Sequence, residues 1–441
     1  MACRLLPLNK NPGVRPIGVC EVIRRIVGKA VLSVIGKDIA HAAGPLQLCA
    51  GQSAGCEAAV HAMRDVFRDD STDAVILVDG SNAFNNLNRQ VALINIRYLC
   101  PSIAVILINC YRGDIQLFVG HEVILSREGT TQGDPLAMAF FALATVPLIE
   151  AIAVENVTPA WFADDAGSGG RLQRLRQWWD KIIELGPKYG YFPNATKSYL
   201  IVKPEKRKEA KKIFEDTDIT ICNTGKRYLG GAIGTDTFLQ EYVETKVATW
   251  VMELERLAKY AAVEPHAAFA ALTHGLISRW LYVIRVVEEC AAEIFQPLEI
   301  AIRHKIIPAL TAQPAPSDEM RKLLALPARF GGLGIVDPTA IVTSQREASK
   351  AISKPLVALI LRNGESCTDI EMTNTSFPRT GNVRQVQEQQ QQVKRRMRNQ
   401  RQQEQAEAES VIDQLPSAQR ECALVAEEKG VSSWLAAIPL D

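Results

Sequence analysis

The feature of this sequence that most restricts its fold is a short apolar run that ends in a carboxylate. Residues 74–78 read Ala-Val-Ile-Leu-Val, and Asp79 and Gly80 follow directly. A wholly apolar run of this length, bounded by polar residues, predicts a buried strand. The carboxylate of Asp79 and a free backbone carbonyl group are therefore expected at the tip of a strand.

A second stretch offers two more carboxylates. Asp164 and Asp165 follow Trp161-Phe162-Ala163 and precede Ala166-Gly167. Adjacent carboxylates repel each other, and bound cations reduce that repulsion. Two-metal phosphoryl transfer uses such oxygen ligands to hold two Mg²⁺ ions about 4 Å apart. Each stretch alone is weak evidence, because a single Asp after a strand is typical of a turn and an Asp pair is typical of a surface.

The order of the surrounding motifs strengthens the interpretation. Between the two carboxylate stretches lies a polar turn, residues 127–137, that opens into an apolar helix; residues 189–198 and 225–231 follow later. In this order the five stretches resemble motifs A to E of a reverse transcriptase palm, of the non-LTR retrotransposon type. Residues 15–18 (Arg-Pro-Ile-Gly) resemble the preceding fingers motif, and residues 327–335 a segment found beyond the thumb. The resemblance covers residues 4–310.

The resemblance implies an α+β fold of the right-hand polymerase type, with fingers, an antiparallel palm sheet backed by helices, and a helical thumb. The implied domains are partial fingers with the fingers–palm connection (1–72), the palm (73–235), the thumb (236–310), a post-thumb connection (311–382) and a Gln/Arg-rich, partly disordered and truncated tail (383–441). The apolar run at residues 434–441 suggests that more chain follows.

The resemblance also assigns roles to individual residues. Asp79, Asp164 and Asp165 would bind two Mg²⁺ ions, for which Mn²⁺ is a substitute, and Lys197 would act as general acid toward pyrophosphate. The residues expected around the nucleotide and template are Arg15, Lys10, Gly80, Phe84, Gln132 and Gly133, and those of the primer grip are Tyr228, Leu229 and Gly230. The implied partners are an RNA template, a DNA or RNA primer and dNTPs, with no membrane; the oligomeric state stays open.

Phe84 discriminates between classes of polymerase. A palm-type RNA polymerase is expected to carry a second Asp five residues after the first, where it bonds to the ribose 2′-OH. This sequence has a phenyl ring there, which accepts no such bond and fills the space of the hydroxyl. DNA synthesis is therefore favoured, although a purely structural role of Phe84 as a core aromatic stays open.

Charge placement, rather than net charge, points to a nucleic acid. The 441 residues carry a formal charge of +1, but residues 1–40, 197–212 and 384–401 are each net +5. Three basic stretches are compatible with a phosphate-binding surface and also with three solvated faces. The ten cysteines form no Cys-x-x-Cys pair, which indicates reduced thiols in an intracellular protein of the nucleus or cytoplasm.

Two departures keep other functions open. Residues 166–170 (Ala-Gly-Ser-Gly-Gly) lack β-branched side chains, so the second strand of the Asp-Asp hairpin is expected to be weak. The chain also begins almost at the fingers motif. The alternatives to an RNA-directed DNA polymerase are a catalytically decayed retroelement remnant that only binds nucleic acid, and a palm-type RNA-dependent RNA polymerase.

Overall fold

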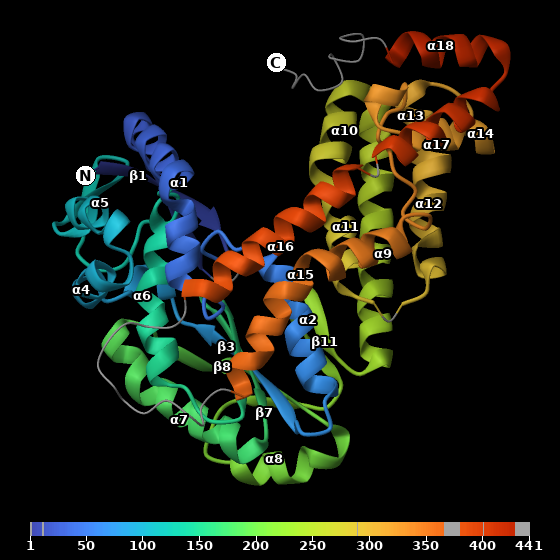
Figure 1. Cartoon of the computed structure of the whole chain (residues 1–441). Helices are drawn as coiled ribbons and strands as arrows, with labels where there is room; N and C mark the ends of the chain where they lie inside the picture. Colours follow the sequence, from blue (N-terminus) through green and yellow to red (C-terminus); the bar gives the residue numbers. More distant parts are fainter. Residues whose placement is uncertain (1, 11–12, 289, 366–379, 400, 428–441) are drawn as a thin grey trace. The chain divides into compact units, whose positions relative to one another are not determined.

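The computed structural model describes residues 2–10, 13–288, 290–365, 380–399 and 401–427 (Figure 1). The chain forms two compact units, residues 1–229 with 353–390 and residues 230–352 with 391–441. The apolar run at 434–441 lies outside the described residues. The α+β class predicted from the sequence is confirmed, because the first unit is built on antiparallel-rich sheets with helices and the second is mainly helical.

A five-stranded sheet forms the centre of the first unit. Its strands, in spatial order, are β6 (Val157–Phe162), β7 (Asp165–Gly170), β3 (Ala74–Gly80), β8 (Pro193–Val202) and β9 (Thr220–Cys222). The pairs are antiparallel except for β8 with β9. The predicted buried strand β3 is therefore the middle strand, with a neighbour on each side.

The expectation of a weak second hairpin strand is wrong. β7 is a complete and mostly buried strand that pairs on both edges, with β6 and with β3. Small residues are needed here because helix α2 (Gly55–Arg68) packs closely on this strand: a Cβ atom at Gly169 would lie 2.3 Å from Cγ1 of Val66. The glycines therefore lower the strand propensity of β7 but allow α2 to pack closely on the sheet.

Helices pack against both faces of this sheet. Ile76 and Val78 of β3 belong to a core formed with α6 (Ala137–Ala151) and α7 (Leu172–Tyr189). Val75 points to the other face, where it and Gly169 meet Val66 of α2. The apolar helix expected after the polar turn is thus α6.

A second, four-stranded sheet contains the strand with the fingers-like motif. Its spatial order is β2 (Val14–Cys20), β1 (Ala2–Asn9), β4 (Ile115–Val119) and β5 (Glu122–Ser126), and β1 runs parallel to β4. Of these strands, β2 is the one that contains the fingers-like motif at residues 15–18. The other helices of residues 1–229 are α1 (Val22–Ala43), α3 (Ala83–Asn86), α4 (Arg89–Leu99), α5 (Pro101–Tyr111) and α8 (Arg207–Ile213), and β10 (Gly225–Tyr228) ends this part.

The second unit begins with β11 (Gly231–Gly234) and continues as helices. The helices are α9 (Asp236–Ala261), α10 (Pro265–Ala271), α11 (Ile277–Val286), α12 (Gln296–Ala301), α13 (Ile307–Thr311), α14 (Asp318–Ala325), α17 (Arg401–Asp413) and α18 (Ser417–Glu427). Helices α15 (Val342–Glu365) and α16 (Thr380–Asn399) each contribute to both units.

Buried contacts order the C-terminal part of the second unit. Arg321 donates two 2.7 Å hydrogen bonds to the carboxylate of Glu299 and a third to the carbonyl oxygen of Ile335, which fixes the glycine-rich segment after α14. Ile412 and Ala423 pack with Leu323 in a small core. The described residues of the Gln/Arg-rich tail are therefore helical, and some of them are buried.

Among the described residues, one stretch is long and apolar enough to cross a membrane. It is Pro265–Val286, whose mean hydropathy reaches 1.3. One such stretch is weak evidence for a membrane span, and Trp280 and Ile284 within it are fully buried inside the protein.

Candidate active site

The strand register brings the predicted carboxylates together. The last pair between β3 and β7 is Val78 with Ala166, and one step further the same register sets Asp79 opposite Asp165. Directly opposed residues of antiparallel strands have Cβ atoms roughly 5 Å apart. Asp164 lies in the adjoining turn, because Phe162 pairs with Asp165 and leaves Ala163 and Asp164 between the strands. Three carboxylates therefore meet at one end of the central strand.

The electrostatics of the two turn-side carboxyls reflect this crowding. The pKa of Asp165 is raised to about 6 by the surrounding protein and by the negative charges of Asp164 and Asp79. The pKa of Asp164 is also raised, first by burial and then by Asp79, while the positive charges of Arg15 and Lys10 lower it. Arg15 and Lys10, two of the residues predicted to lie around the nucleotide, are therefore near enough for their charges to act on Asp164.

Two buried side chains that the sequence analysis did not assign hold the Asp-Asp turn. The hydroxyl group of Tyr191 donates to the carbonyl oxygen of Asp164 over 2.9 Å, and its ring lies against Gly80. The side-chain amide of Gln47 binds both backbone groups of Ala163. Tyr191 lies within the predicted motif at residues 189–198, and that position could have identified it as a residue of the site. Gln47 is 116 residues from Ala163, and nothing in its local sequence marks it.

The other strand neighbour of β3 supports Asp79 from behind. The pairing of β3 with β8 is interrupted by a bulge between Leu77 and Asp79, after which Asp79 pairs with Asn194. The buried hydroxyl of Ser198 accepts from the backbone N–H of Asp79 over 3.3 Å and donates to the carbonyl of Asn194 over 2.7 Å. Lys197, beside Ser198, is exposed, and its role as general acid stays a prediction.

Phe84 lies just beyond Asp79, in the short helix α3. Its half-exposed ring stacks on Phe141 of α6, with 4.4 Å between the ring centroids and 17° between the planes. Phe84 thus has the core role that the sequence analysis left open, because one face of its ring packs on the core. That contact also fixes the ring in place.

The polar turn at 127–133 packs against the strand with the fingers-like motif. The backbone N–H of Gly18 donates to the carbonyl of Gln132 over 2.6 Å. Gly133 has a φ of +105°, and a Cβ atom there would lie 2.4 Å from the carbonyl oxygen of Gly18, so only glycine fits. The structure therefore joins the predicted motif-B residues to the strand of Arg15.

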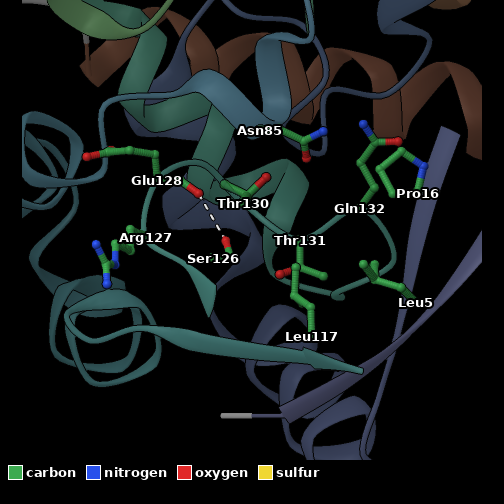
Figure 2. A pocket seen from close by; sticks show the side chains of 10 residues that line it. All are labelled: Leu5, Pro16, Asn85, Leu117, Ser126, Arg127, Glu128, Thr130, Thr131 and Gln132. Atoms are coloured by element: carbon green, nitrogen blue, oxygen red, sulfur yellow. Dashed lines mark hydrogen bonds between the residues drawn. The ribbon is translucent and has the colours of Figure 1, made fainter. Parts of the chain in front are cut away.

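A pocket with a mixed polar and apolar lining opens between these elements (Figure 2), with a volume of about 270 Å³. Asn85, Thr130 and Gln132 lie on one side of it, and Leu5 and Leu117 on the other. Within the described residues, the buried hydroxyl groups of Thr130 and Thr131 have no hydrogen-bond partner. Such groups are uncommon in folded proteins, and both residues line this pocket.

The predicted primer-grip residues lie at the division between the two units. Tyr228 is buried in the first unit, and its hydroxyl donates to the carbonyl of Ala160 on β6 over 3.0 Å. Leu229 and Gly230 have positive φ values of 46° and 80° and form a tight turn. In the second unit, the carbonyl of Gly230 accepts from the hydroxyl of Tyr242 over 2.9 Å.

The carboxylates fit one kind of metal site. In the described part of the chain, no three Asp, Glu, His or Cys side chains form a ready-made cage for a metal ion. Mg²⁺ is commonly held by one or two carboxylates and completes its coordination with water and substrate phosphates. The carboxylates of Asp79 and Asp164 suit that mode of binding. Burial, followed by the negative charge of Asp79, raises the pKa of Asp164, and a bound cation would offset both effects.

The basic stretch at 197–212 lies mostly away from the carboxylates. Val202 pairs with Ala74 at the opposite end of β3 from Asp79, about 17 Å away at ~3.3 Å per strand residue. Lys206 is also engaged, in ion pairs of 3.3 Å with Asp73 and with Glu209. The exposed cations of this stretch beyond Lys206 are Arg207, Lys208, Lys211 and Lys212.

We expect glutamine at these four exposed positions to weaken the salt dependence of primer–template binding. Each lost phosphate contact reduces the slope of log K against log salt by about 0.9. Fluorescence anisotropy across a salt series measures this slope, and arginine at Lys208, Lys211 and Lys212 is the control that keeps the charge. An unchanged slope in the glutamine variant would identify α8 as a solvated face only.

Asp165→Asn is expected to stabilise the protein at neutral pH when no divalent cation is present. The folded protein binds the Asp165 proton more tightly than the unfolded chain, so the free energy of unfolding falls as pH rises from about 4 to about 6. Because Asp165 is exposed, the gain at pH 7 is about 1 kcal/mol rather than the full value of the shift. Urea denaturation at pH 4 and pH 7 measures it, and a gain that is equal at both pH values would contradict this origin.

Comparisons with known proteins give remote structural likeness and no sequence family. No protein-family model matches the chain, and no curated protein sequence does either. Telomerase from Candida albicans, in complex with a TWJ fragment of telomeric RNA, is similar over 83% of this chain and 62% of that chain, at 10% identity and a TM-score of 0.44. Telomerase from Candida tropicalis with the same type of fragment is similar over 88% and 64%, at 10% identity and 0.44.

A third similar structure is apo telomerase from Candida tropicalis truncated from its C-terminal domain. It is similar over 53% of each chain, at 14% identity and a TM-score of 0.37. The chain thus spans 53% to 64% of the length of these three proteins.

Proposed function

We propose that this chain is an RNA-directed DNA polymerase of the non-LTR retrotransposon type, which adds dNTPs to a primer 3′-OH. The observation that carries the proposal is the strand register that sets Asp79 opposite Asp165, with Asp164 in the adjoining turn. The motif resemblance along the sequence predicted these same three carboxylates. Such a protein would act inside the cell, in the nucleus or cytoplasm.

The chain's own residues divide the work of phosphoryl transfer. Asp79 and Asp164 would hold two Mg²⁺ ions, which supply charge neutralisation at the attacking and leaving oxygens. Arg15 and Lys10, whose charges already act on Asp164, would bind the triphosphate. Gln132, which lines the pocket together with Thr130 and Thr131, would contact the template or the incoming nucleotide. Lys197 would give a proton to the departing pyrophosphate.

A labelled primer annealed to an RNA template tests the proposal. Purified protein with Mg²⁺ and dNTPs is expected to extend the primer, and Mn²⁺ is expected to substitute for Mg²⁺. Extension with ribonucleotides alone would support the RNA polymerase alternative instead. Tight primer–template binding without any extension would overturn the proposal.

One observation favours a second candidate, a remnant that binds nucleic acid without catalysis. Four exposed cations, Arg207, Lys208, Lys211 and Lys212, follow the end of β8 that lies away from the carboxylates. The two candidates differ in one result. The polymerase gains thermal stability from Mn²⁺ in the presence of primer–template and dNTP, whereas the remnant gains it from primer–template alone.

A further inference from the structure

We infer that Gln47 is a positioning residue for the carboxylates: it holds the Asp-Asp turn in its working conformation. The inference deepens the proposed function. The expected effect on primer extension rests on that proposed function, whereas the hydrogen bonds of Gln47 do not depend on it. Gln47 belongs to none of the predicted motifs. It lies in the segment between α1 and α2, and its exposed fraction is 0%.

The amide group of Gln47 is fully used. Its oxygen accepts from the backbone N–H of Ala163 over 2.8 Å. Its nitrogen donates to the carbonyl oxygen of Ala163 and to the hydroxyl oxygen of Thr145, each over 3.1 Å. The neighbouring backbone adds a fourth bond, from the N–H of Leu48 to the carbonyl of Trp161 over 2.8 Å. One side chain thus ties both sides of Ala163 to helix α6.

Ala163 needs such support because its backbone conformation is unfavourable. Its φ is +54°, in the left-handed region that non-glycine residues seldom occupy. It is also the first residue of a two-residue hairpin turn, a place where turns with a positive φ usually take glycine. Without the Gln47 bonds, the turn is expected to relax and to shift the carboxylate of the next residue, Asp164.

Helix α6 gives the clamp a firm base. Thr145, which accepts from Gln47, donates back to the carbonyl oxygens of Phe141 and Ala142 in the same helix. Phe141 is the residue on which the Phe84 ring stacks. One turn of α6 therefore supports both the metal-binding turn and the aromatic ring beside the nucleotide site.

The test uses Gln47→Met, which keeps the approximate volume of the side chain and removes every hydrogen bond of its amide group. We expect the kcat of primer extension to fall about 100-fold, the loss typical of a catalytic group displaced by about 1 Å, with the KM for dNTP and the Kd for primer–template within about twofold of wild type. Gln52→Met is the matched control, because Gln52 is also buried and also donates to backbone carbonyls, those of Ala40 and Gly44. It is expected to keep its kcat.

The double variant Gln47→Met with Ala163→Gly separates positioning from general stability. Glycine adopts a positive φ without strain. The Ala163→Gly substitution should therefore restore kcat to within about tenfold of wild type, although the hydrogen bonds of the Gln47 amide stay absent. A kcat that Gln47→Met leaves unchanged, or a loss that Ala163→Gly does not relieve, would overturn the inference. If Gln47→Met fails to fold, Tyr191→Phe frees the same turn at Asp164 and should show the same relief by Ala163→Gly.

A readout without catalysis keeps the two hypotheses apart. The increase in Tm on addition of Mn²⁺ reports on the carboxylates whether or not the chain polymerises. We expect a smaller increase in Gln47→Met than in wild type and in Gln52→Met. If wild type extends no primer but this difference is found, the proposed function fails and the positioning role stands; if all three proteins respond equally, the positioning role fails.

Discussion

Asp79→Asn and Asp164→Asn are each expected to reduce primer extension at least ~1,000-fold while leaving the fold intact. Asparagine keeps the shape of the side chain but removes the charge that a divalent cation requires, and a loss of this size corresponds to about 4 kcal/mol of transition-state stabilisation. Without divalent cations both variants should be at least as stable as wild type, because each removes one of three crowded negative charges.

Asp70→Asn is the matched control for these variants. Asp69 and Asp70 form another adjacent aspartate pair, and both are exposed at the end of α2. This control should retain full activity and stability. Full activity in both Asp79→Asn and Asp164→Asn would remove these residues from the site, and loss of the folded structure would leave Asp165→Asn as the variant to assay.

Phe84→Val is expected to raise the efficiency of ribonucleotide incorporation relative to deoxyribonucleotide incorporation by about 100-fold or more. A ribonucleotide would press its 2′-OH into the Phe84 ring, and stacking on Phe141 prevents the ring from moving aside. Steric rejection by a packed ring exceeds the ~1–3 kcal/mol available from a missing methylene group. Competition between matched nucleotide pairs in single-turnover extension gives the ratio.

Phe141→Leu provides the matched control for Phe84. It removes the stacking partner but keeps the ring, so its effect on sugar choice should lie between wild type and Phe84→Val. Both variants lose aromatic packing and should be less stable by roughly 1–3 kcal/mol, which is why the ratio of efficiencies is compared rather than the rates. An unchanged ratio in an active Phe84→Val protein would restrict Phe84 to the core role.

The sequence predicted the parts of the site that depend on local patterns. The apolar run before Asp79 forms the predicted strand, because its short length and its polar boundaries favour a strand over a helix. The polar turn at 127–137 opens into α6 as expected. The carboxylates could be paired in advance only through the motif resemblance. The register between Val78 and Ala166, which sets Asp79 opposite Asp165, is a long-range property that no local pattern encodes.

The parts that escaped prediction depend on tertiary contacts. Glycines in β7 read as a weak strand, yet the approach of Val66 to Gly169 makes small residues a requirement. The strands β1 and β4 pair in parallel although more than 100 residues of sequence separate them, so neither strand could be inferred from its own pattern. Gln47 is recognisable as part of the site only once Ala163 is seen between its two amide atoms.

The central claim is that Asp79 and Asp164 bind the catalytic metals with a nucleotide and primer in place. Anomalous diffraction at the manganese edge tests it directly, on crystals of the wild-type protein with an RNA template, a chain-terminated DNA primer, the matching dNTP and Mn²⁺. The account predicts anomalous density in contact with the carboxylates of Asp79 and Asp164 and with the triphosphate. A bound dNTP with no manganese at these two carboxylates would contradict it.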